Sequence, residues 1–319
     1  MYNVKMGKNT IKIIYILILT LFTVSSFSML YFKNNARQDY IKKINYCFNI
    51  TQNLEINVSC VEDLYEETLN DKNFINLYNY LQETATQEKS MRKFYICHKA
   101  AHNAGGMIVE KLGGITNSLK LLNKPACGLI HAPYDYFGRE KHSFSKWSDL
   151  VKECSNIQSK LDYYIQCDDA IGHSIVQSLS KYKKLYNDPY FSYKVCAIFK
   201  DIYAQVNCGE AIIMERFGPL DPNVKPEAYI PVKDLVTQCL SIPSDIMSGK
   251  AGCSSGVGWY LTMFYLDEVR LSSRNNDFSD ILFKVEKDCA IFKSSLTKLC
   301  YDRFEKILYE SNNTFKITK

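Results

Sequence analysis

Four of the five histidines stand at the start of segments that open with a cysteine, and this repeated placement is the strongest chemical signal in the chain. Three openings read C-H-K-A-A-H, C-G-L-I-H-A and C-D-D-A-I-G-H, and a fourth, C-G-E-A-I-I-M-E, ends in a glutamate. Since equivalent positions of stacked helices face the same side, these residues predict one polar row. The row consists of His98, His102, His131, His173 and Glu215.

His98 and His102 are four residues apart, so on a helix their imidazoles share one face and reach one cation. A third nitrogen would come from His131 or His173, with Glu215 or another carboxylate such as Asp169 nearby. This donor set suits zinc, and also copper or non-haem iron, with one position left for water. The sequence therefore predicts a divalent transition-metal site.

A metal in this row would also provide chemistry. A bound divalent ion lowers the pKa of its water, and Glu215 or Glu210 would then accept the proton as a general base. The leading functional hypothesis is therefore metal binding, with metal-dependent hydrolytic or oxidative activity.

The same residues allow a purely structural interpretation. Gly, Ala and Ser recur in the openings, as close helix approach requires, and buried histidines can join one helix to the next by hydrogen bonds. In that case the chain would be a non-enzymatic scaffold whose concave face recruits a protein or a glycan.

A third hypothesis is a serine hydrolase. The stretch Gly252 to Gly256, G-C-S-S-G, fits the nucleophile-elbow pattern G-x-S-x-G with Ser254 as the nucleophile. That motif has its catalytic meaning only between a strand and a helix, whereas the surrounding sequence is helical in pattern.

The cysteines predict disulfides. There are twelve, and no two form C-x-x-C, which argues against zinc ribbons, thioredoxin-type centres and ferredoxin-type clusters. A gap of 11 to 14 residues suits the end of one helix, a short loop and the start of the next, although other connectivities are permitted. The predicted neighbours are Cys47/Cys60, Cys154/Cys167, Cys196/Cys208, Cys239/Cys253 and Cys289/Cys300, with Cys97 and Cys127 left over.

Apolar residues recur at helical spacing, and the later cysteines recur with a period in the forties. The expected fold is all-α, a disulfide-braced, solenoid-like array of helical-hairpin repeats behind an N-terminal transmembrane helix. The expected domains are a short basic cytoplasmic tail (1–12), a transmembrane signal anchor (13–32), a stalk or capping helices (33–90) and the helical repeat domain (91–319).

The N-terminal segment points to a membrane. Three lysines precede an uncharged run from Ile13 to Phe32, which as a helix is long enough to cross a bilayer core. It is either an uncleaved anchor, which we favour, or a long signal peptide. Because disulfides persist in oxidising compartments, we expect a single-pass membrane protein with its body extracytoplasmic, in a secretory lumen, a periplasm or at the cell surface.

Surface features limit the partners. Three N-x-[ST] acceptors, Asn49, Asn57 and Asn312, would carry glycans only in a eukaryotic secretory route. The formal net charge of +5 is modest and the two signs are interspersed, which predicts no nucleic-acid partner. The expected partners are the membrane, through the N-terminal helix, and a protein or glycan on the concave face.

The succession C-H-x-x-x-H, C-G-x-x-H-A, C-x-x-A-x-G-H and C-G-x-x-x-x-M-E runs from Cys97 to Glu215. It resembles a motif series of uncharacterised, predominantly bacterial, extracytoplasmic helical proteins. The resemblance implies that the row acts as one unit, and it implies no particular activity.

Overall fold

The computed structural model describes residues 20, 37–69, 74–87, 91–114, 117–118, 142–158, 167–182, 188–218, 227–265, 268–269, 272 and 277–315. Within these ranges every regular element is a helix, and no strand occurs. The prediction of an all-α fold is confirmed.

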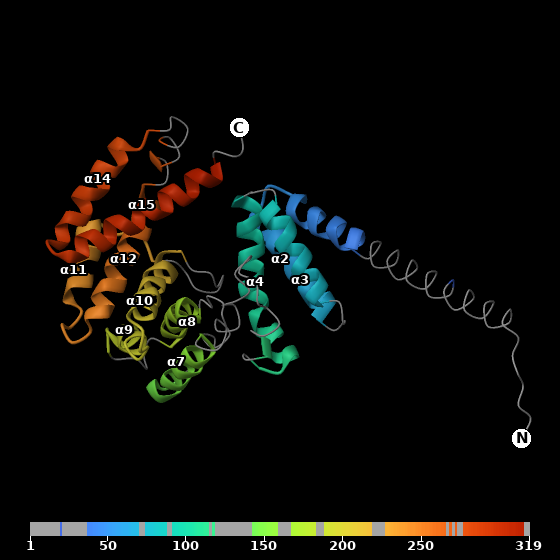
Figure 1. Cartoon of the computed structure of the whole chain (residues 1–319), viewed down its shortest axis with the longest axis horizontal. Coiled ribbons are helices and arrows are strands. Elements are labelled where there is room, and N and C mark those ends of the chain that lie inside the picture. The colour runs from blue at the N-terminus through green and yellow to red at the C-terminus, as the bar shows by residue number, and fades with distance from the viewer. Residues whose placement is uncertain are drawn as a thin grey trace, which may run out of the picture.

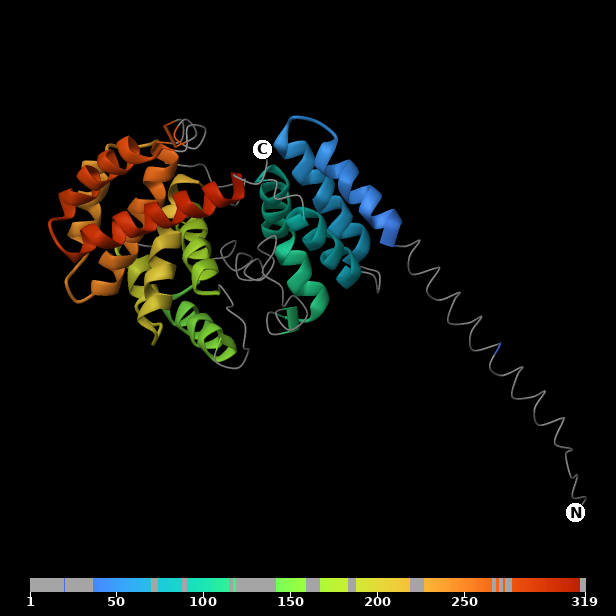
Figure 2. The same cartoon turned by 45° about the horizontal axis from the view of Figure 1, so that its top comes forward.

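The helices form two groups that lie side by side (Figure 1, and turned by 45° in Figure 2). The first group contains a helix over residues 37–49, followed by α2 (Leu54–Leu69), α3 (Phe74–Gln87) and α4 (Met91–Leu112). The second contains α7 (Phe144–Gln158), α8 (Cys167–Lys181), α9 (Phe191–Cys196), α10 (Ile202–Phe217), α11 (Val232–Ser241), α12 (Met247–Phe264), α14 (Ser279–Cys289), the short 3-10 helix η3 (Ala290–Phe292) and α15 (Ser295–Phe315).

Each group is built around a hydrophobic core, and Val109 of α4 also belongs to the core of the second group. The first is built around Phe48 and Tyr65 and extends to Ile108 on α4, so α4 packs with the helices that precede it. The second is built around residues such as Trp147 and Tyr260. The predicted domain boundary between residues 90 and 91 stays a prediction, but α4 shares its core with α2 and α3.

All five predicted cysteine pairs are present as disulfides, with Cα separations from 5.3 to 5.9 Å: Cys47–Cys60, Cys154–Cys167, Cys196–Cys208, Cys239–Cys253 and Cys289–Cys300. Each ties the last two turns of one helix to the first two turns of the next. Cys97 is also in a disulfide, whereas Cys127 lies outside the described residues. The predicted pairing of neighbours is therefore confirmed where it can be followed.

The long helices α8, α10, α12 and α15 pack against one another in chain order. Small residues make this close approach possible. A Cβ atom added to Gly252 of α12 would lie 2.7 Å from both the Gly209 Cα and the Val206 carbonyl oxygen of α10, nearer than real Cβ atoms come to backbone. Gly209 and Gly252 thus allow α10 and α12 to pack closely.

Two N-terminal predictions have different outcomes. None of the described helices is both long and apolar enough to span a bilayer, and the predicted anchor over residues 13–32 lies outside the described residues apart from Thr20. The side chain of Asn57 is fully buried and donates a 2.8 Å hydrogen bond to the Cys47 carbonyl, which leaves no space for a glycan in the folded chain. Asn49 is exposed, and the side chain of Asn312 is outside the described ones.

Candidate functional site

The first part of the site is a pair of histidines on α4. His98 and His102 are one turn apart, and their Nε2 atoms lie 3.2 Å from each other. The rings meet edge to face with centroids 4.5 Å apart, and His102 is almost completely buried. Two nitrogens on one tetrahedral zinc ion lie roughly 3.3 Å apart, given bonds of about 2.0–2.1 Å. The pair therefore has the donor spacing of a chelate, and the same spacing also fits a shared hydrogen bond.

The second part lies on α8 and α10. The His173 Nε2 is 3.6 Å from the Asp169 Oδ2 one turn earlier, and the His173 Nδ1 is 2.9 Å from the Glu215 Oε2. Gln177 adds a 3.4 Å hydrogen bond to the other oxygen of Glu215, which is fully buried. A carboxylate behind the Nδ1 of a histidine fixes the ring and leaves Nε2 directed outward. Glu215 thus orients His173.

The two parts face each other across the boundary between the helix groups. The ring centroids of His102 and His173 are 6.4 Å apart. Within the described ranges, no three His, Cys, Asp or Glu side chains converge closely enough to hold a metal ion. His131 lies outside the described residues, so its predicted place in the row stays a prediction. The structure therefore brings four of the five predicted residues together in two facing pairs, His98 with His102 and His173 with Glu215.

The charge of His173 is set by its surroundings. Burial lowers the pKa of His173, but Asp169 and Glu215 outweigh this effect and raise it to about 10. At neutral pH and without a metal, His173 is therefore an imidazolium held between two carboxylates. The ion pair joins α8 to α10.

This ion pair predicts a pH dependence of stability. Because the folded-state pKa of about 10 lies above the usual value near 6.5, the stabilisation is complete below about pH 6.5 and is lost as the pH rises through about 10. We expect the difference in melting temperature between the metal-free protein and His173→Gln to be largest near pH 6 and to shrink toward pH 10. Calorimetry of both proteins with a chelator measures it, and a difference that does not change with pH would contradict the ion pair.

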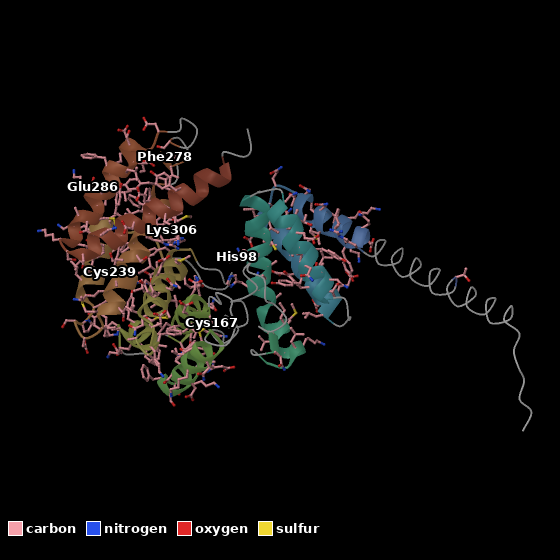
Figure 3. The ribbon with its side chains drawn as sticks, viewed as in Figure 1. His98, Cys167, Cys239, Phe278, Glu286 and Lys306 are labelled. Carbon is pink, nitrogen blue, oxygen red and sulfur yellow. A yellow bond between two sulfur atoms is a disulfide. The ribbon has the colours of Figure 1, made fainter. Side chains whose placement is uncertain are left out.

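His98, Asp169 and His173 line a pocket of about 570 Å³. The remaining lining comes from α10, α12 and α15 and the residue after α10. In Figure 3, His98 lies on the side of α4 that faces the second helix group, and Lys306 lies on α15 of that group. The other lining residues are Asn207, Glu210, Met214, Gly218, Ser255, Trp259, Leu299, Asp302 and Arg303.

The pocket-lining residues recur at fixed distances after four of the cysteines. The residues two positions after Cys167, Cys208, Cys253 and Cys300 all line the pocket, and so do the residues six positions after them. The first set is Asp169, Glu210, Ser255 and Asp302, and the second is His173, Met214, Trp259 and Lys306. Positions four apart share a helical face, which explains why both sets point to the same space. The sequence pointed to Asp169 and Glu210 of the first set but not to Ser255 or Asp302, although the constant spacing was a signal that could have found them.

Glu210 belongs to a second buried polar cluster. One of its oxygens accepts a 2.6 Å hydrogen bond from the Ser255 hydroxyl, and the other accepts a 2.6 Å bond from the Arg303 Nε. Burial raises the pKa of Glu210, although Arg303 and Ser255 act in the opposite direction. The proton-acceptor role predicted for Glu210 and Glu215 stays a hypothesis, but both carboxylates occupy positions typical of groups that orient their neighbours.

Ser254 does not have the surroundings of a nucleophile elbow. It lies inside α12, is fully buried, and donates a 2.6 Å hydrogen bond to the Leu296 carbonyl. The motif requires a turn that follows a strand, and the described ranges contain none. In this structure, Ser254 joins α12 to α15.

Comparisons with protein families, with curated proteins and with solved structures found no match to this chain, so the motif-level resemblance stays a hypothesis.

Proposed function

We propose that this protein binds a transition metal ion, with zinc as the first candidate, between two facing pairs of side chains. The ligands would be His98 and His102 of α4 together with Asp169 and His173 of α8. The observation that carries the proposal is the donor spacing within each pair, 3.2 Å and 3.6 Å, because both are close to the roughly 3.3 Å edge of a tetrahedral zinc site.

Loading the site requires two changes. The pairs must approach each other, since imidazoles on one tetrahedral zinc ion have centroids roughly 5 Å apart and those of His102 and His173 are 6.4 Å apart. His173 must also release the proton on Nε2, while its Nδ1–H stays with Glu215. Because α4 and α8 belong to different helix groups, the ion would link the two groups.

The proposal extends to chemistry and location. A water on the ion would serve hydrolytic chemistry, with Glu215 or Glu210 as the hypothesised proton acceptor. The oxidative alternative would need copper or iron in the site in place of zinc, which has no redox chemistry. The constant register of pocket positions supports a solenoid of hairpin repeats that keeps its functional residues on the inner face. The disulfides support an extracytoplasmic body behind the N-terminal anchor.

Metal uptake by the full chain tests this function. The protein is purified oxidised and without a histidine tag, then titrated with zinc, copper and iron(II), and its bound metal is measured by elemental analysis. We expect the unmodified protein to bind about one equivalent of metal. Mutating a residue that only hydrogen-bonds to a metal ligand typically weakens metal binding roughly 10–100-fold, and we expect His102→Ala, which removes a ligand, to weaken it more. His142→Ala, which removes a buried histidine outside the row, should keep its metal. Failure to take up any of the three metals would reject the proposal.

A second candidate is the non-enzymatic scaffold with structural histidines, its concave face recruiting a protein or glycan. One observation favours it, namely that both ring nitrogens of His173 face carboxylates. In that case neither the unmodified protein nor His173→Gln takes up metal, and the substitution lowers the stability of the chain.

A further inference from the structure

We propose that Trp259, Arg303 and Lys306, which line this pocket, recognise the carboxylate of a small organic acid, and that the rest of the acid reaches the metal pairs. This inference rests on the proposed metal site and names the class of molecule that the site would act on or hold.

Arg303 is positioned before any ligand arrives. Its Nε donates a 2.6 Å hydrogen bond to Glu210, which is held in turn by the Ser255 hydroxyl. The Glu210 side chain is 8% exposed, whereas that of Arg303 is 24% exposed and lines the pocket. A guanidinium has five N–H donors in a planar fork and matches carboxylate geometry. Glu210 therefore fixes an arginine whose outer edge lies at the pocket.

Lys306 adds a second cation on the same face. It follows Arg303 by three residues on α15, and both residues line the pocket. Residues three apart on a helix are neighbours on its surface, so one carboxylate can contact both side chains. Lys306 is an exposed residue of this lining.

An apolar wall lies beside the two cations. The indole of Trp259 lines the pocket with Met214 and Leu299. Gly218 leaves room for this ring, because a Cβ atom at that position would lie 3.0 Å from the Trp259 Cη2. A carboxylate joined to an aromatic or aliphatic body would thus find a charged contact and an apolar contact next to each other.

The charges favour a monoanion. Apart from the histidines, the lining contains three carboxylates, Asp169, Glu210 and Asp302, and two cations, Arg303 and Lys306. A divalent metal ion would leave this set with a single positive charge. A carboxylate carries the one negative charge that balances it, and a pocket of about 570 Å³ has the size of a small-molecule site.

The test uses 4-fluorobenzoate as the probe and neutral 4-fluorobenzamide as its matched control, both followed by ¹⁹F NMR on the full chain. We expect the carboxylate to bind more tightly than the amide, and to bind more tightly still after loading with one equivalent of zinc. Lys306→Glu should weaken the binding of the carboxylate about tenfold or more, which corresponds to about 1.4 kcal/mol. Lys287→Glu makes the same charge change at an exposed position of α14 outside the pocket and should have no effect.

Two results would overturn the inference: equal binding of the two probes, or the same affinity in Lys306→Glu and Lys287→Glu. These results are separable from a failure of the metal site. If zinc is not taken up but the metal-free protein still prefers the carboxylate in a Lys306-dependent way, the metal proposal alone fails. If zinc binds but the probes are not distinguished, the carboxylate site alone fails.

Discussion

Gly252→Val is expected to destabilise the protein by about 3 kcal/mol or more, the largest loss among the substitutions considered. Even a Cβ atom at this position would lie 2.7 Å from the Gly209 Cα and the Val206 carbonyl oxygen. Both are backbone atoms of α10, so no side-chain rotation can relieve the contact. The helices would have to separate, and their separation would disturb Glu210 and Ser255, which lie on the same two helices.

Urea unfolding followed by circular dichroism measures this effect. Lys233→Val is the matched control, because it places the same β-branched residue at an exposed position of the neighbouring helix α11 and tests the cost of helix propensity alone. A similar loss of stability in the two variants would show that the close approach of α10 and α12 does not limit the fold.

Arg303→Met is expected to cost about 3 kcal/mol, because it leaves the buried carboxylate of Glu210 without its charged partner. The partial exposure of Arg303 reduces the expected loss below that of a fully buried pair. The double variant Glu210→Gln/Arg303→Met should recover much of the stability, since the amide is neutral and its carbonyl still accepts the Ser255 hydroxyl.

Chemical denaturation of both single variants and of the double variant completes a double-mutant cycle. The expected result is a coupling energy that favours the double variant over the sum of the singles. Additive losses would mean that Arg303 and Glu210 contribute independently, and that Glu210 does not hold the guanidinium in place.

Several features of this protein follow from local sequence alone. The disulfide pairs were predictable because a gap of 11 to 14 residues leaves a cysteine in one helix few places to meet its neighbour, and Cys154 with Cys167 is an example. The helices were predictable from the spacing of apolar residues. The pairs His98/His102 and Asp169/His173 follow from the 3.6-residue turn, which places residues four apart on one face.

Other features were decided by packing between distant segments. Arg303 meets Glu210 across 93 residues of sequence, and no local pattern indicates which carboxylate a given arginine will reach. Ser254 and Ser255 are adjacent and chemically identical, yet one bonds to the Leu296 carbonyl and the other to Glu210. The rotation of α12 about its axis, between α10 and α15, decides which hydroxyl meets which acceptor.

The candidate site also combines features set by local sequence with features set by the packing of distant segments. The sequence alone indicated which side chains to look for, since the predicted histidines and Glu215 all follow a cysteine within seven positions. Only the tertiary structure decided that Glu215 lies behind His173, and that α4 turns His102 toward α8. The physical reason is that helix periodicity acts over one or two turns, whereas the facing of two helices depends on the packing of both hydrophobic cores.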